Sequence, residues 1–275
     1  MALAGGSEEL TTIYLPSNTP CSYFNNTTAH FITDLAEPIE LRAGAKVALS
    51  ELIWPNTVLN VFTPINELEF TKVEAQEVGV RVIFRRRTWK KSIPEKYYQS
   101  AKGLIDTING LLRRQRMETK LSLDETTGKC KVSVFPEEKI TMHKTLSNIL
   151  GFFDTTEFFA KKEDLYNKVF TSEVVPDASL LTYCFFIYSD IVYPTRVGST
   201  EVPVLGILRC DTEKTASQYK HNALPILNFV PVTGSTLNKI EIKITDTTGQ
   251  LIHFQFGKVI IKLILSQPAK DETQI

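Results

Sequence analysis

The histidines are the side chains best suited to metal binding or general acid–base chemistry, and their spacing argues against both. They are His30, His143, His221 and His253, and no two of them are near each other in the sequence. A zinc site usually shows its ligands at short, recognisable spacings. The GxSxG, HExxH and glycine-rich phosphate-loop patterns are also missing. We therefore predict no enzymatic activity, no catalytic residue, no bound metal and no cofactor.

The cysteines likewise give no reactive motif. Cys21, Cys130, Cys184 and Cys210 form no CxxC pair, and the last three fall within apolar strand patterns, where a buried free thiol is expected. The first ten residues, MALAGGSEEL, lack the charged-then-apolar pattern of a signal peptide. No apolar run reaches the roughly 18 residues that span a membrane. We expect no membrane span and assembly inside a cell.

Two carboxylates stand out against apolar strands. Asp190 follows a central apolar run, where a hydrogen-bonded structural role is the favoured interpretation. Glu51 has the same parity as Val47, Leu49 and Ile53, so a regular strand would bury it. We predict a β-bulge that turns Glu51 outward, with a functional buried carboxylate as the alternative.

The most conspicuous candidate site is a basic cluster. The 275-residue chain holds 31 basic and 31 acidic residues, yet residues 81–120 hold 12 basic and 3 acidic ones, a balance of +9 against −9 elsewhere. The cluster consists of Arg85, Arg86, Arg87, Trp89, Lys90, Lys91, Arg113, Arg114 and Arg116.

Three interpretations of this cluster remain open. It could be a solvated strand end and helix face, because arginine near a helix C-terminus is favoured by the helix dipole. It could contact an acidic protein surface, including another copy of the chain. It could also bind phosphates, with Trp89 stacking on a base.

The elements that must position these residues are mostly strands. Residues 181–192 form an unbroken apolar and aromatic run, which predicts a strand covered on both faces. Pro194 ends it, Gly198 turns the chain, and residues 202–208 start a neighbouring strand. Residues 254–265 predict the last and longest strand, with a bulge at Gly257. Its core face should carry Val259, Ile261, Leu263 and Leu265.

A different pattern interrupts the strands near residues 95–155. Ser100 can cap an amphipathic helix of about four turns, residues 121–134 predict a hairpin, and Thr145 can cap a short helix ended by Gly151. Residues 78–84 alternate as one strand before this segment. We predict an all-β antiparallel sandwich or barrel over residues 10–265 with a small inserted α/β segment, a flexible arm at 1–9 and a polar tail at 266–275.

Several segments, taken in order, resemble a known family. They are TIYLPSN, PIELRAGAKVALSELIWPN, GLIDTINGLL, LSNILGF, FFIYSDIVYPTRVGSTEVPVLGIL and FGKVIIKLIL. The series is similar to the penton, or minor capsid, protein of Polinton/Maverick-type viruses, virophages and adintoviruses. This resemblance implies a single jelly-roll β-sandwich and a structural virion protein that forms homopentamers at the five-fold vertices of an icosahedral capsid.

The resemblance also implies partners and a location. Neighbouring subunits would be double jelly-roll major capsid proteins, with a weak contact to packaged DNA, and the protein would reside in the virion capsid after assembly inside the host cell. It brings no catalytic residues, and the basic run at 85–91 has no counterpart in the family pattern. The alternatives are a carbohydrate- or protein-binding β-sandwich module and a nucleic-acid-binding protein that uses residues 81–120.

Overall fold

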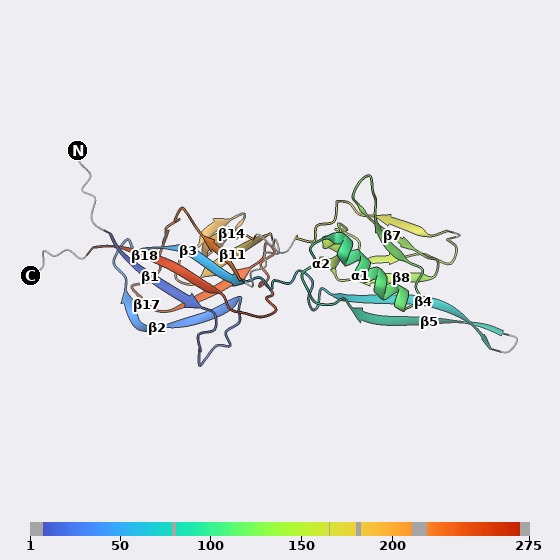
Figure 1. Ribbon diagram of the computed structural model, residues 1–275, viewed down its shortest axis with the longest axis horizontal. Coiled ribbons are helices and arrows are strands. Elements are labelled where there is room, and N and C mark those ends of the chain that lie inside the picture. Colours follow the sequence, from blue (N-terminus) through green and yellow to red (C-terminus); the bar gives the residue numbers. More distant parts are fainter. Residues whose placement is uncertain (1–7, 79–80, 165, 180–182, 211–218, 270–275) are drawn as a thin grey trace, which may run out of the picture. The chain divides into compact units, whose positions relative to one another are not determined.

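The chain folds as two compact units that are rich in antiparallel strands. The computed structural model describes residues 8–78, 81–164, 166–179, 183–210 and 219–269. Met1–Val58 and Leu181–Ile275 make one unit, the jelly-roll unit, and Leu59–Leu180 make the other, the inserted unit (Figure 1). The predicted strand at 181–192 is described from residue 183 onward, and its first two residues lie outside the described part.

The jelly-roll unit contains a five-stranded sheet and a four-stranded sheet. One has the order β1-β18-β3-β15, with the short β16 also paired to β3, and the other has the order β14-β11-β17-β2. The strands are β1 (Glu8–Pro16), β2 (His30–Glu40), β3 (Lys46–Pro55), β11 (Cys184–Ser189), β14 (Val204–Arg209), β15 (Tyr219–Ala223), β16 (Val230–Pro231), β17 (Thr236–Thr245) and β18 (Ile260–Pro268). A small hairpin of β12 (Thr195–Val197) and β13 (Thr200–Val202) precedes β14.

The pairing of these strands is nested. β1 pairs with β18, β2 with β17, β3 with β15 and β16, and β11 with β14, all antiparallel. Two further pairs, β18 with β3 and β11 with β17, join the nested pairs into the two sheets. If β15 and β16 are counted as one interrupted strand, eight strands are paired first with last, second with seventh, third with sixth and fourth with fifth. This is the jelly-roll topology, and it confirms the predicted fold class.

The core lies between the two sheets. Inward residues alternate along β11 and β17, where Phe185, Ile187, Ile242 and Ile244 are at most 1% exposed. The predicted core face of the last strand is also confirmed. Its four apolar residues, Val259, Ile261, Leu263 and Leu265, are all fully buried.

A bulge in β3 places Glu51 outside this core. The register with β18 pairs Leu263 with Leu49 but Lys262 with Glu51, so Ser50 is the extra residue. The predicted outward rotation of Glu51 is therefore confirmed. The prediction that Ile53 faces the core is wrong, because the bulge reverses the parity and buries Leu52 and Trp54 instead.

The ends of the predicted strands also differ from the structure. β18 begins at Ile260 rather than at residue 254, and Gly257 lies in the preceding loop with φ +100°. A Cβ at Gly257 would lie 2.5 Å from the Cβ of Pro55, so the turn is tight and needs glycine. Glu8 lies in β1 and Gln267 lies in β18, and these two strands pair, although the sequence predicts an arm and a tail at these positions.

The inserted unit has two further sheets and two helices. Its sheets have the orders β5-β4-β8-β9 and β10-β7-β6. The elements are β4 (Glu67–Val78), β5 (Arg81–Ser92), α1 (Ala101–Arg114), β6 (Lys120–Leu123), β7 (Cys130–Val134), β8 (Glu138–Met142), α2 (Lys144–Ile149), β9 (Glu157–Phe159) and β10 (Lys168–Thr171). This unit, Leu59–Leu180, extends well beyond the predicted 95–155 segment at both ends.

Both predicted helices are present, with one cap corrected. Ser100 accepts a hydrogen bond from the Gly103 N–H at the start of α1, as predicted. The cap of α2 is His143 rather than Thr145, since the His143 side chain accepts from the Thr145 N–H. The predicted strand at 78–84 is also wrong, because it joins the end of β4 to the start of β5, two antiparallel strands of a hairpin.

Candidate functional site

The basic run lies on a β-hairpin of the inserted unit. β4 and β5 pair along their whole length, from Glu67 opposite Ser92 to Val78 opposite Arg81. β8 pairs with β4 only as far as Lys72, so the hairpin beyond it is a two-stranded ribbon (Figure 1). β5 is also an edge strand of its sheet.

The residues of the basic run divide between the two faces of the hairpin. Side chains alternate along a strand, so Arg85, Arg87, Trp89 and Lys91 share one face while Arg86 and Lys90 share the other. Trp89 is half-buried, and the five basic side chains are exposed. The structure thus brings these residues onto one hairpin without collecting them on one surface.

Acidic residues of β4 lie opposite the basic run. Glu74 is the cross-strand partner of Arg85 and forms an ion pair with Arg87 at 3.3 Å between Oε2 and Nη1. Glu69 lies opposite Lys90 at 3.9 Å. Within the described residues, no ion pair forms at Arg85, Arg86 or Lys91, so part of the positive charge is left uncompensated.

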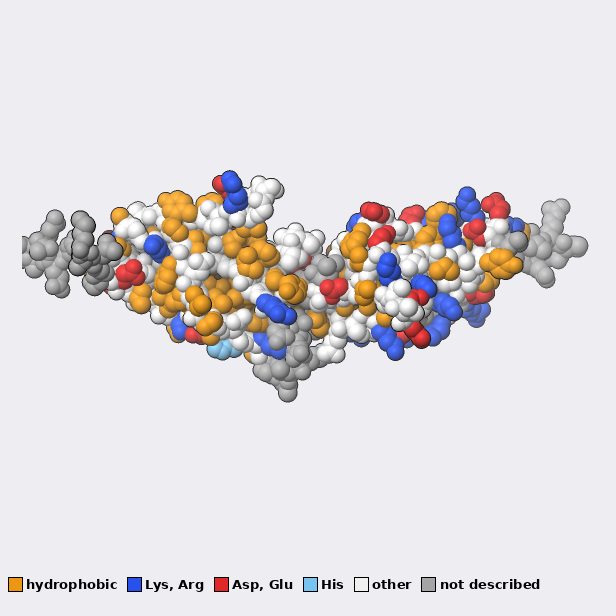
Figure 2. Space-filling view, turned by 90° about the horizontal axis from the view of Figure 1, so that it is seen from above, with side chains coloured by type: hydrophobic (Ala, Val, Ile, Leu, Met, Phe, Trp, Pro, Cys, Tyr) orange, Lys and Arg blue, Asp and Glu red, His pale blue; other side chains and the backbone are white. Residues whose placement is uncertain are grey.

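The two structural units differ less in net charge than the sequence windows do. The inserted unit holds 20 basic and 17 acidic residues, and the jelly-roll unit holds 11 and 14. The balances are therefore +3 and −3, much smaller than the +9 and −9 of the sequence windows. Figure 2 shows Lys and Arg side chains interspersed with Asp and Glu over the inserted unit. The net charges of the two units are too small to support head-to-tail pairing of copies of the chain. Such pairing has to be argued from particular surfaces.

Of the three arginines at the end of α1, Arg116 is bonded to the hairpin through its backbone. Arg113 and Arg114 lie in the last turn of α1 and are exposed. Arg116 has a left-handed backbone, with φ 55°. Its carbonyl oxygen accepts a hydrogen bond from Lys72 Nζ at 2.9 Å, which fixes the end of the helix beside β4.

A buried carboxylate beneath this hairpin is a feature that sequence reasoning missed. Glu138 is 1% exposed and its Oε1 lies 3.2 Å from Lys72 Nζ. The same carboxylate accepts hydrogen bonds from the backbone N–H groups of Glu118 and Thr119 and from the Thr119 hydroxyl. The strand alternation of Glu138 with the buried Ile140 could have revealed it. The role of Glu138 is structural, since its oxygens are fully engaged by protein groups.

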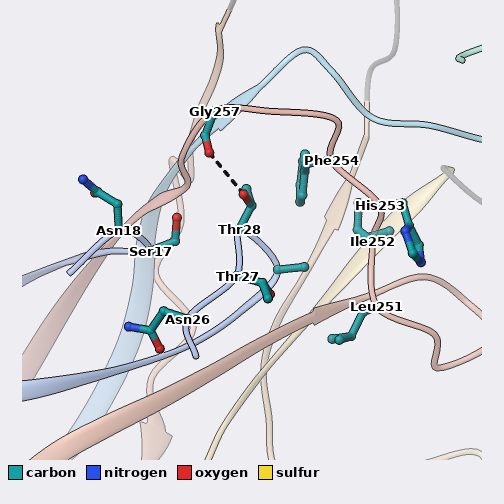
Figure 3. Close-up of a pocket in the computed structure, with 11 residues that line it drawn as sticks. Ser17, Asn18, Asn26, Thr27, Thr28, Leu251, Ile252, His253, Phe254 and Gly257 are labelled. Carbon is teal, nitrogen blue, oxygen red and sulfur yellow. Dashed lines mark hydrogen bonds between the residues drawn. The ribbon is translucent and has the colours of Figure 1, made fainter. Parts of the chain in front are cut away.

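A polar pocket in the jelly-roll unit is the natural place to look for a bound sugar. It is lined by Ser17, Asn26, Thr27, Thr28 and Phe254, among others. Three of its polar side chains make hydrogen bonds within the fold. The Thr28 hydroxyl donates to the Gly257 carbonyl (Figure 3). Asn26 bonds the backbone of Ile32, and Ser17 accepts from the Val259 N–H. The geometry is that of a loop corner tied together by side chains.

The two carboxylates singled out in the jelly-roll unit are structural. Asp190 Oδ1 accepts from the Glu241 N–H at 2.8 Å, as expected, and partial burial raises the pKa of Asp190. Glu51 bonds Lys262 Nζ at 2.6 Å and approaches His221 Nε2 at 3.3 Å. The hydrogen bonds from Lys262 and, next, from His221 hold the pKa of Glu51 below its ordinary value.

Among the described residues, no group of three or more His, Cys, Asp or Glu side chains could hold a metal ion. None of the helices in the described part of the chain is long and apolar enough to cross a membrane.

Comparison with known proteins gives a fold-level likeness only. No protein-family model and no curated protein matches the chain. Among solved structures it is similar to a crystal structure of the mavirus penton protein, with 11% identity, a TM-score of 0.42, and coverage of 94% of this chain and 99% of that one. It is also similar to a chain of the Sputnik virophage solved by cryo-EM, with 11% identity, a TM-score of 0.45, and coverage of 95% and 98%. These values are low, so the function is argued from the topology and surfaces of the chain itself.

Proposed function

We propose that the chain is a structural virion protein, a penton that forms homopentamers at the five-fold vertices of an icosahedral capsid. The observation that carries this proposal is the nested pairing of eight strands. Jelly rolls of this kind build viral capsid and lectin domains. A lectin would present unused polar groups in a pocket, whereas Ser17, Asn26 and Thr28 in the pocket described above are bonded within the fold.

Four of the six segments that resemble pentons build this topology, and the other two, GLIDTINGLL and LSNILGF, lie on α1 and α2 of the inserted unit. TIYLPSN covers the end of β1, and PIELRAGAKVALSELIWPN covers the end of β2 and all of β3. The central segment runs from β11 to β14, and FGKVIIKLIL leads into β18. The resemblance therefore includes strands that pair across the jelly roll as well as both helices of the inserted unit, and it does not depend on one loop.

The open edges of the two sheets leave surfaces through which copies of the chain could form a ring. Each open sheet of the jelly-roll unit ends in two edge strands, β1 and β15 in one sheet, β14 and β2 in the other. A closed ring uses a heterologous contact, in which one side of each copy meets the opposite side of the next. A ring that is stable on its own should bury at least about 1,000 Å² per contact.

The proposal includes partners and a role for the basic hairpin. The pentamer would sit among double jelly-roll major capsid subunits, in a virion assembled inside the host cell. Arg85, Arg86 and Lys91, unpaired among the described residues, would contact an acidic surface of a neighbouring protein. Contact with packaged DNA would be weak.

The test is a particle reconstruction that contains this chain. We expect its density at the five-fold vertices and nowhere else. Density at any other position would overturn the penton assignment and favour the binding-module alternative.

A further inference from the structure

The outer face of one jelly-roll sheet divides into an apolar half and a charged half. On the half formed by β11 and β14, the outward side chains include Phe186, Tyr188 and Ile207, and Ile207 is 52% exposed. The rings of Phe186 and Tyr188 stack with centroids 6.4 Å apart. On the half formed by β17 and β2, the outward positions carry an ion-paired set, His30, Glu241 and Lys243. The two halves of the same face therefore differ in what they are suited to contact.

A groove continues the apolar half around the edge of the sandwich. It has a volume of about 460 Å³ and lies between β14 and the chain leading to β16. Its apolar lining includes Val197, Ile207, Leu224, Ile226 and Val230. Ile226 is 83% exposed, more than the other large aliphatic side chains in the described part of this unit. Contiguous exposed apolar surface of this kind marks protein interaction sites.

The strand beside the groove lacks the usual protection of a free edge. Charged residues and proline normally shield edge strands from pairing with other chains. The outer edge of β2 has Glu37, Pro38 and Glu40, and β5 carries the basic run. β14, with the sequence VLGILR, has its first charge at Arg209, the last residue.

The opposite side of the sandwich has complementary charge. Its edge strands β1 and β2 contain five acidic residues and no Lys or Arg, namely Glu8, Glu9, Asp34, Glu37 and Glu40. The described residues from β12 to β15 contain three basic residues and one acidic residue, namely Arg196, Arg209, Lys220 and Glu201. The β1 side also exposes Leu10 at 63% and Tyr14 at 60%, so it offers apolar side chains to a groove.

We infer that the groove and edge at β14 bind the β1–β2 side of a second copy of this chain. This inference rests on the proposed pentamer and names the two surfaces that close it. The exposed Leu10 and Tyr14 would lie against the apolar surface around Ile207 and Ile226. The acidic strand ends of one copy would face the arginines of the next. Such a head-to-tail contact joins two different surfaces, as a closed ring requires.

The test uses the full chain in three double variants. I207D/I226D places charges on the β14 side, and L10R/E37R alters the β1 side. The matched control, Y166D/V169D, lies on the inserted unit, where Tyr166 and Val169 are 85% and 55% exposed, close to the values for Ile226 and Ile207. Circular dichroism and thermal melts verify that each variant is folded. Sedimentation velocity from about 1 µM to about 1 mM measures self-association.

We expect the wild type and the control to associate alike, with affinities within about twofold, and each side variant to lose at least about tenfold. An equimolar mixture of the two side variants has one intact contact, so it should recover dimers that neither variant forms alone. A wild type that stays monomeric at about 1 mM, side variants that associate normally, or L10R/E37R dimerising by itself would each overturn the inference. The position of the protein in the particle is decided separately by the reconstruction.

Discussion

Glu138 holds together three segments of the inserted unit that are distant in sequence. It lies on β8, faces Lys72 of β4, and accepts hydrogen bonds from Glu118 and Thr119 between α1 and β6. Removing one member of a buried charged network leaves its partners unpaired, which costs more than the network contributes. A substitution of Glu138 therefore tests whether these three segments depend on its carboxylate.

We predict that Glu138→Gln lowers the free energy of unfolding by about 2–4 kcal/mol, because the amide cannot accept all the bonds that the carboxylate does. Urea unfolding measures the change. Glu157→Gln is the control, since the ion pair of Glu157 with Lys139 is half-exposed and should contribute less than about 1 kcal/mol. Equal effects of the two substitutions would contradict the role given to Glu138.

Glu51 should make stability depend on pH in the acid range. Lys262 and His221 lower its pKa in the folded chain, so its contribution is fully present above its ordinary pKa of 4.5 and is lost as the pH falls through the lowered value. We predict that Glu51→Gln reduces the melting temperature at pH 7 and has little effect at pH 2. Thermal melts of both proteins at the two pH values measure this. A larger drop in melting temperature at pH 2 than at pH 7 would contradict this prediction.

At the scale of the elements, two glycines of the inserted unit should respond oppositely to the same substitution. Gly151 ends α2 with φ +85°, and a Cβ there would lie 2.3 Å from the Val174 carbonyl oxygen. Gly110 is inside α1, and a Cβ there would meet nothing within 4 Å. Gly110→Ala should raise the free energy of unfolding by about 0.5–1 kcal/mol, because alanine has the higher helix propensity. Gly151→Ala should lower the free energy of unfolding by more than about 1 kcal/mol. Urea unfolding of both variants checks the signs.

The β4–β5 hairpin should contact protein in preference to DNA. A DNA site with six or more phosphate contacts loses affinity by orders of magnitude with modest added salt. We predict that the chain binds duplex DNA weakly and that R85A/R86A/R87A changes this little, as fluorescence anisotropy over a salt series would measure. R113A/R114A is the control for unspecific charge loss. Tight, steeply salt-dependent binding that disappears only in the triple variant would show a nucleic-acid site.

Individual residues show why some elements could be predicted and others could not. The bulge at Glu51 followed from one misplaced charge, and the start of α1 from the cap at Ser100. The register after the bulge could not be predicted, because Leu52 and Ile53 are equally apolar. The alternation at 78–84 predicted one strand, because the sequence has apolar residues at 78, 80, 82 and 84, on both sides of the boundary between β4 and β5.

At the scale of the whole molecule, the candidate site was predicted only in part. The run at 85–91 does lie on one element, but Glu69 and Glu74, from a strand earlier in the chain, sit opposite it. A window of sequence cannot include such cross-strand partners. The same limit hid Glu138 and the groove beside β14, because each is assembled from segments that only the folded chain brings together.

The two units have separate hydrogen-bonded sheets, and every strand pair of the inserted unit lies between residues 59 and 180. We predict that a fragment of residues 59–180 folds alone. Circular dichroism and cooperative urea unfolding would measure this, and a fragment without a cooperative transition would contradict it. Glu138→Gln in the fragment should reproduce the loss seen in the full chain.

The pairing of the first strand with the last has a consequence for synthesis on the ribosome. Glu8 pairs with Pro268, so β1 emerges long before its partner exists. At about 5–20 residues per second, the delay is roughly 13–50 s. During that time β1, β2 and β3 are a nascent segment without a sheet, while the inserted unit, made of local pairs, can already fold. The arrival of β18 is therefore the last step in pairing the strands of the jelly roll, and until then the exposed apolar strands are prone to aggregate.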